Sequence, residues 1–120
     1  MIDIDETLLY FIGSTPHWVN KKSWDELYKR IIDSHSDMIF ITTRYSYNEE
    51  YTKEHFKHLG LEYKNVYHTS AGDKGEFAFK NFNREIKGRP KILLDDLTIN
   101  LIEMKNYYPE THVYQFQRLE

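Results

Sequence analysis

Short apolar runs alternate with helical patterns along this chain, and turn-forming or charged residues separate them. A short apolar run between turn signals is typical of a buried strand, and apolar residues three or four positions apart are typical of a helix. The predicted strands cover residues 38–41, 66–68, 91–94 and 111–115, and the predicted helices cover residues 20–34, 47–59, 74–86 and 98–107. This alternation predicts an α/β fold with a mostly parallel sheet.

The clearest helical pattern lies in residues 20–34, where apolar side chains form one face. Asn20 and Ser23 are both candidates for its N-terminal cap. The next predicted helix is expected to stop at Gly60, because glycine readily adopts the left-handed conformation that ends a helix. Residues 8–19 contain glycine and proline and lack the helical spacing, so they predict a loop or a small hairpin.

Polar clusters stand at the carboxyl ends of the apolar runs. Residues 3–7 read DIDET, residues 42–44 read TTR, and residues 95–96 read DD. Lys74 begins a helix that follows another strand, so it can reach the same edge of the sheet. In open parallel sheets this edge is where ligands bind, and the clusters therefore predict one shared site.

Asp3 and Asp5 suit two kinds of chemistry. Two carboxylates one residue apart can coordinate a hard cation such as Mg²⁺, which takes oxygen ligands. A carboxylate can also act as a nucleophile and form an aspartyl-phosphate. The string D-x-D-x-T is short, and charged residues often follow a strand for structural reasons. The rest of the chain therefore has to decide whether this string is a functional motif.

Composition narrows the function classes. The chain has 120 residues, 40% of them hydrophobic and 29% charged, which fits one globular domain. The net charge of −3 gives no reason to expect sequence-independent nucleic-acid binding. There is no cysteine, which excludes disulfides, thiolate metal sites and cysteine catalysis from within the chain. Without a membrane-spanning run or a signal pattern, a cytoplasmic protein with no membrane partner is expected.

The ordered set D-x-D-x-T, a strand ending in Thr, a Lys, and a strand ending in Asp-Asp resembles the haloacid dehalogenase (HAD) superfamily of phosphotransferases. The likeness covers nearly the whole chain. It implies a three-layer Rossmann-like sandwich around a mostly parallel five-stranded sheet of order 5-4-1-2-3. The short segments between the motifs imply a single HAD-like phosphatase domain, residues 1–120, without a large cap.

The resemblance also implies a role for each catalytic residue. Asp3 matches the nucleophile and metal ligand. Asp5 matches the general acid and base, whose backbone carbonyl helps to hold Mg²⁺. Thr42 matches the hydroxyl that hydrogen-bonds the phosphoryl oxygens, and Lys74 matches the cation that neutralises the phosphoryl group and the nucleophile. Lys74 and the metal are expected to keep Asp3 ionised.

The remaining site residues flank these four. Asp95 and Asp96 match the fourth motif of the family and are expected to form the metal site. Asp95 is expected to bind the metal directly, and Asp96 to bind it through water or to contact one of its ligands. Thr43 and Arg44 are expected to bind substrate. For Arg44 two interpretations stay open, since it could bind a second phosphate or pair with a carboxylate.

Several residues also have ordinary structural interpretations. A lysine such as Lys74 often starts a helix in contact with solvent, and Asp95 and Asp96 could cap the following helix. His55 and His58 lie three positions apart on a predicted helix without a carboxylate partner, which favours a solvated face over a metal site.

The resemblance implies an Mg²⁺-dependent phosphatase that works through an aspartyl-phosphate. The absence of a cap implies an open-access substrate, such as a nucleic-acid end or a phosphoprotein. Family members have four or five apolar residues before the first catalytic Asp, whereas Met1 and Ile2 alone precede Asp3 here, so the first strand looks truncated. Missing upstream residues, a partner, or a compromised fold would each account for this. The alternative is a catalytically inactive HAD-like module for binding or assembly.

Overall fold

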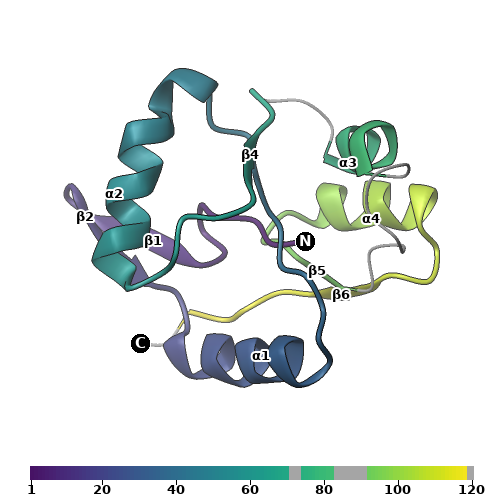
Figure 1. Ribbon diagram of the computed structural model, residues 1–120, viewed down its shortest axis with the longest axis horizontal. Coiled ribbons are helices and arrows are strands. Elements are labelled where there is room, and N and C mark those ends of the chain that lie inside the picture. The colour runs from purple at the N-terminus through teal and green to yellow at the C-terminus, as the bar shows by residue number, and fades with distance from the viewer. Residues whose placement is uncertain (71–73, 83–91, 119–120) are drawn as a thin grey trace.

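The fold is α/β, with short strands and helices alternating along most of the chain (Figure 1). The computed structural model describes residues 1–70, 74–82 and 92–118. The elements are β1 (Leu9–Ile12), β2 (Thr15–Trp18), α1 (Lys21–Asp33), β3 (Phe40–Thr42), the 3₁₀ helix η1 (Ser46–Asn48), α2 (Glu49–Leu59), β4 (Val66–His68), α3 (Lys74–Phe82), β5 (Ile92–Leu94), α4 (Thr98–Tyr107) and β6 (His112–Tyr114).

The strands of the described residues form three two-stranded sheets. β3 pairs with β4 and β5 pairs with β6, both in parallel, and β1 pairs with β2 in an antiparallel hairpin. Ile2 lies between the two parallel pairs and makes isolated parallel bridges to Phe40 and to Leu94. Backbone hydrogen bonds join this segment to both sides, from Ile2 N to Ile39 O at 2.8 Å and from Asp3 N to Leu94 O at 2.9 Å.

The expected continuous five-stranded sheet is therefore present only as these smaller pieces. The physical reason lies in the residues that follow Asp3. Leu8 N donates to Ile4 O at 2.9 Å, and Glu6 has a left-handed φ of 58°. The chain has already turned there, so it cannot extend a ladder beside β3 and β5.

Side chains alternate between two hydrophobic cores, as the period of a strand requires. Phe40 packs with Trp24 of α1 and Phe56 of α2, whereas the next residue, Ile41, packs with Met104 of α4. Leu94 and Leu93 divide between the same two cores. Helices α1 and α2 therefore cover one side of the strands, and α3 and α4 cover the other.

Most local predictions are confirmed within the described residues. Asn20, not Ser23, caps α1, because its Oδ1 accepts from Ser23 N at 3.0 Å. Gly60 ends α2 with a φ of 75°. Residues 8–19 form the β1–β2 hairpin, whose two-residue turn has Gly13 at a φ of 63°, the conformation that a type II′ turn needs at its first position.

Several predicted boundaries differ from the observed ones. The strand expected at residues 111–115 is the shorter β6. The strand expected at residues 38–41 begins at Phe40 and includes Thr42, and the helix expected from residue 47 begins as the 3₁₀ helix η1. The helix predicted to residue 86 is described as far as Phe82. Residues 83–86 of that prediction, and Lys91 of the predicted strand, lie outside the described residues.

Helix α3, which carries Lys74, packs closely against α4. A Cβ added to Gly75 would stand 3.0 Å from the Tyr107 ring and 3.1 Å from the backbone oxygen of Glu103. A side chain at this position would press on α4, so glycine allows the start of α3 to lie close to that helix.

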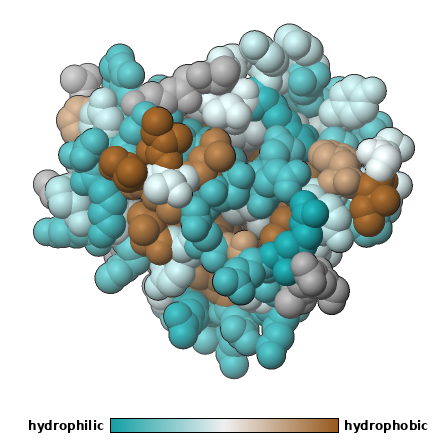
Figure 2. Space-filling model, turned by 180° about the vertical axis from the view of Figure 1, so that it is seen from behind, coloured by the Kyte–Doolittle hydropathy of each residue, from teal (hydrophilic) through white to brown (hydrophobic). Residues whose placement is uncertain are grey.

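Large apolar side chains also remain on the surface, among them Ile12 of the hairpin and Ile99 and Ile102 of α4. Figure 2 shows apolar patches at two sides of the face that it draws, with hydrophilic surface between them. None of the helices in the described ranges is long and apolar enough to cross a bilayer.

Candidate functional site

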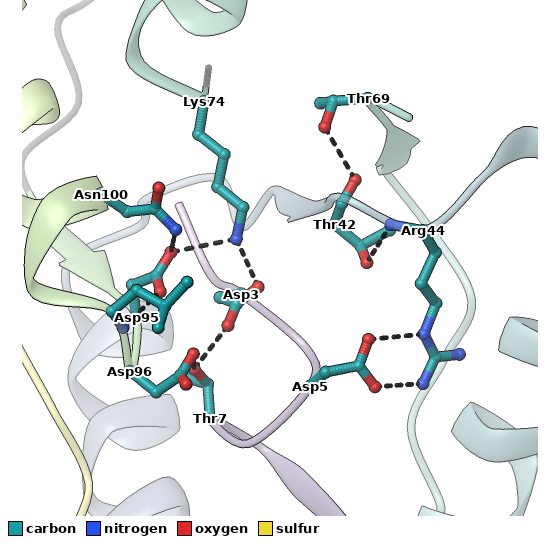
Figure 3. Close-up of polar contacts among 11 residues, drawn as sticks. Asp3, Asp5, Thr7, Thr42, Arg44, Thr69, Lys74, Asp95, Asp96 and Asn100 are labelled. Carbon is teal, nitrogen blue, oxygen red and sulfur yellow. Dashed lines mark hydrogen bonds and ion pairs between the residues drawn. The ribbon is translucent and has the colours of Figure 1, made fainter. Parts of the chain in front are cut away.

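Lys74 is a buried lysine that joins two buried carboxylates (Figure 3). It is the first residue of α3, and only 2% of it is exposed. Its Nζ donates to Asp3 Oδ1 and, at 3.0 Å, to Asp95 Oδ2. A charge is found buried in this way only when it is paired, so the three side chains depend on one another. The interpretation of Lys74 as a solvated lysine is wrong.

Thr7 holds the other oxygen of Asp3. Its hydroxyl donates to Asp3 Oδ2 at 2.6 Å and also lies 3.2 Å from Asp96 Oδ1. The turn of the chain after Asp3, with Glu6 in the left-handed region, brings Thr7 back over the residue four positions earlier. Left-handed backbone is uncommon for a residue such as Glu and is often found at functional sites.

Asp95 is held from three sides and is fully buried. Its Oδ1 accepts from Leu97 N at 3.0 Å. Leu97 is itself the N-cap of α4 and no side chain caps this helix, so the capping interpretation of Asp95 is wrong. Asp95 Oδ2 accepts from Asn100 at 3.1 Å as well as from Lys74. Sequence reasoning missed Asn100. Its signal was a polar side chain in the first turn of a helix, where side chains tilt back toward the helix start.

The carboxylate oxygens of Asp3, Asp95 and Asp96 come within 4.8 Å of one another. When all three carboxylates are ionised, they and the Lys74 ammonium carry a net charge of −2, which a divalent cation would balance. Oxygen donors of this kind fit Mg²⁺. The structure thus brings together three of the four expected metal ligands.

Burial raises the pKa of Asp3 from 3.8 to about 7. Lys74 lowers this pKa by its charge and its hydrogen bond, Asp95 raises it, and the hydrogen bond from Thr7 lowers it. The desolvation of a buried carboxylate exceeds these compensating contacts. Lys74 alone therefore offsets only part of the effect of burial on this pKa. That Lys74 and the metal together keep Asp3 ionised stays a prediction.

Asp5 points away from this cluster, and its side chain is not among the clustered carboxylates (Figure 3). Arg44 holds it in a two-pronged ion pair, from Nε to Oδ2 at 2.9 Å and from Nη2 to Oδ1 at 2.6 Å. The Asp3 and Asp5 carboxylates therefore do not form one cation site, because residues 3 and 5 of the turning chain face different partners. The role of the Asp5 backbone carbonyl at the metal stays a prediction. For Arg44, the structure shows the carboxylate pairing.

Thr42 and Thr43 differ in position. Thr42 is buried at the end of β3, and its Oγ1 accepts from Arg44 N at 3.1 Å. The bridge between Ile2 and Phe40 sets Thr42 beside the turning segment after Asp3. Thr43, the next residue, is exposed to solvent.

His55 is half-buried beside Arg44, so the expected solvated face is wrong for this residue and right for the exposed His58. Its Nδ1 lies 2.9 Å from Arg44 Nη1. Burial lowers the pKa of His55, and the charge of Arg44 lowers it further. Burial also lowers the pKa of His68, which approaches the same arginine through Thr52.

Comparisons of this chain with protein-family models, with curated proteins and with solved structures gave no match. The chemistry of the site therefore has to be argued from its own side chains.

Proposed function

We propose that this chain is an Mg²⁺-dependent phosphatase that forms an aspartyl-phosphate on Asp3. The observation that carries the proposal is the buried Lys74 ammonium between Asp3 and Asp95, with the Asp96 carboxylate within 4.8 Å of both. Phosphoryl transfer asks a protein mainly to place charges and donors around the transferring group. A nucleophile, a cation and a carboxylate cluster are gathered here at one place.

Asp3, Asp95 and Asp96 would hold the cation, with Asp5 also expected to reach it through its backbone carbonyl. When bound, Mg²⁺ would supply positive charge that favours the ionised form of Asp3 and neutralises phosphoryl oxygens. This matters because burial alone raises the pKa of Asp3 to about 7.

In the proposed reaction an Asp3 carboxylate oxygen attacks phosphorus while the bond from phosphorus to the ester oxygen breaks. Asp5, acting as an acid, gives that oxygen a proton. Water then attacks phosphorus, the bond to Asp3 breaks, inorganic phosphate leaves, and Asp5 takes the proton of the water. Lys74 neutralises the transferring group, and the Thr42 hydroxyl binds its oxygens.

Arg44 donates to both Asp5 oxygens, and each of these oxygens has a further lone pair, so Asp5 can carry the proton of the acid step while Arg44 holds the carboxylate in place. Arg44 and the exposed Thr43 border the same segment and are proposed to contact the substrate.

The lateral order of the strands also supports the proposal. Laterally, the segments follow the order β6, β5, the Ile2 segment, β3, β4, as the pairings and bridges indicate. We propose that these segments form a Rossmann-like sheet of order 5-4-1-2-3. In this numbering strand 1 is the Ile2 segment, strands 2 and 3 are β3 and β4, and strands 4 and 5 are β5 and β6. The first strand is reduced to a bridge. No large cap separates its motifs, so a nucleic-acid end or a phosphoprotein remains the proposed kind of substrate.

The test is hydrolysis of an aryl phosphate with and without Mg²⁺, by the wild-type chain and by Asp3→Asn. We expect metal-dependent turnover that Asp3→Asn abolishes while the circular dichroism spectrum stays that of a folded chain. Turnover retained in Asp3→Asn would refute the nucleophile. A folded wild-type chain without turnover would favour the alternative, a catalytically inactive module for binding or assembly.

A further inference from the structure

A second polar cluster lies on the other edge of the Arg44 guanidinium from Asp5. Arg44 Nη1 donates to Thr52 Oγ1 at 3.2 Å and lies 2.9 Å from His55 Nδ1. Both partners belong to α2, where Thr52 is fully buried and His55 is half-buried. Nε and Nη2 face Asp5, so one planar group joins the helix to the carboxylate.

The donors and acceptors of this cluster fit together without conflict. Thr52 Oγ1 donates to Asn48 O at 3.2 Å, so its lone pairs accept from Arg44 and from His68 Nε2, which lies 3.1 Å away. Arginine has no acceptor, so His55 Nδ1 must accept and its ring proton is on Nε2. Thr52 Oγ1 thus donates one hydrogen bond and accepts two, and His55 Nδ1 accepts one.

We propose that Thr52 and His55 are positioning residues that fix the Asp5 carboxylate by holding Arg44 in place. An arginine side chain has many rotamers, and ordering it costs side-chain entropy. Two contacts from a rigid helix keep the guanidinium in the orientation that grips both Asp5 oxygens. This inference rests on the proposed function, in which Asp5 transfers the proton.

The His55 site offers a matched pair of variants. His55→Phe keeps a ring against Phe11, whose centroid lies 5.0 Å from that of His55, but it removes the acceptor. His55→Asn loses the ring but keeps an oxygen close to the place of Nδ1. Thr52→Val and Thr52→Ser make the same comparison at the second contact, and His58→Asn on the exposed face is the control.

The first readout compares two substrates by kcat/KM in the presence of Mg²⁺. An alkyl phosphate needs its leaving oxygen protonated, whereas nitrophenolate leaves without a proton. We expect His55→Phe and Thr52→Val to lower kcat/KM roughly 10- to 100-fold for the alkyl phosphate and less than about threefold for nitrophenyl phosphate. His55→Asn, Thr52→Ser and His58→Asn should stay within about threefold of wild type on both. Equal losses on both substrates would overturn the positioning role.

The second readout does not need turnover, so it separates this inference from the proposed function. The Arg44 Nε–H signal in ¹⁵N NMR should be sharp and slow to exchange in the wild-type chain, because Asp5 accepts from it at 2.9 Å. We expect it to broaden in His55→Phe and Thr52→Val and to persist in His55→Asn and Thr52→Ser. If His55→Phe and Thr52→Val leave the signal as in wild type, α2 does not fix Arg44 and the inference fails.

Discussion

Replacing Lys74 by methionine tests the buried ion cluster directly. Methionine keeps an apolar stem of similar length and removes the ammonium. The side chains of Lys74, Asp3 and Asp95 are 2%, 8% and 0% exposed, so solvent cannot compensate for the loss. Removing one partner from a buried pair costs about 3–5 kcal/mol, because the other charge stays buried.

That cost is large for a domain of this size. The free energy of unfolding of a globular protein is about 5–15 kcal/mol. One kcal/mol shifts Tm by roughly 3–5 °C for a chain of intermediate length, so Lys74→Met should melt roughly 10–25 °C lower than wild type. The difference in Tm between Lys74→Met and wild type should shrink at acid pH, where the remaining carboxylates take up protons.

The measurement is thermal unfolding followed by circular dichroism at pH 7.5 with a metal chelator. Lys53→Met is the control, because the Lys53 side chain is 43% exposed and its ion pair with Glu50, at 3.3 Å, should contribute less than about 1 kcal/mol. A Lys74→Met melting temperature within about 2 °C of wild type would show that this ammonium does not compensate the buried carboxylates.

Three further outcomes are expected. The pKa of Asp3 rises from 3.8 to about 7 on folding, so the stability that its protonated form contributes is complete below pH 4 and is lost as pH rises through 7. Urea unfolding of wild type and Asp3→Asn in chelator should therefore diverge between pH 4 and 7, and a constant difference would contradict the shift. Mg²⁺ should raise the Tm of the wild-type chain by mass action but should not raise the Tm of Asp95→Asn. Glu110→Gln changes an exposed carboxylate and should respond to Mg²⁺ like wild type. Equal responses in all three proteins would argue against the carboxylate site. Gly75→Ala should destabilise the chain by about 1–3 kcal/mol in urea unfolding, because its Cβ would stand 3.1 Å from the Glu103 backbone oxygen; an unchanged midpoint would mean that α3 and α4 separate freely.

Local structure followed from local sequence. The helix predicted for residues 98–107 and the strand predicted for residues 66–68 have the observed bounds. Asn20 and Gly60 cap and end helices as their residue types favour. Neighbours in the chain decide these features, since hydrophobic period, caps and left-handed glycine act within one or two turns.

The candidate site was predictable as a set of residues but not as a set of contacts. The order of the motifs placed Asp3, Lys74 and Asp95 at one edge. From sequence, however, Arg44 had two open roles, His55 was expected on a solvated face, and Asn100 drew no attention. Each of these roles depends on which side chain from another element lies opposite.

The sequence by itself determined the α/β class, the approximate positions of the helices and strands, and the candidacy of Asp3, Lys74 and Asp95 for one site. The tertiary structure alone decided that the five strands expected in one sheet appear as smaller pieces around Ile2, and that Asp5 faces Arg44 instead of the carboxylate cluster. It also decided the raised pKa of Asp3. The reason is that Lys74 meets partners 71 and 21 positions away, and only the packing of helices against strands sets the burial and distances of such contacts.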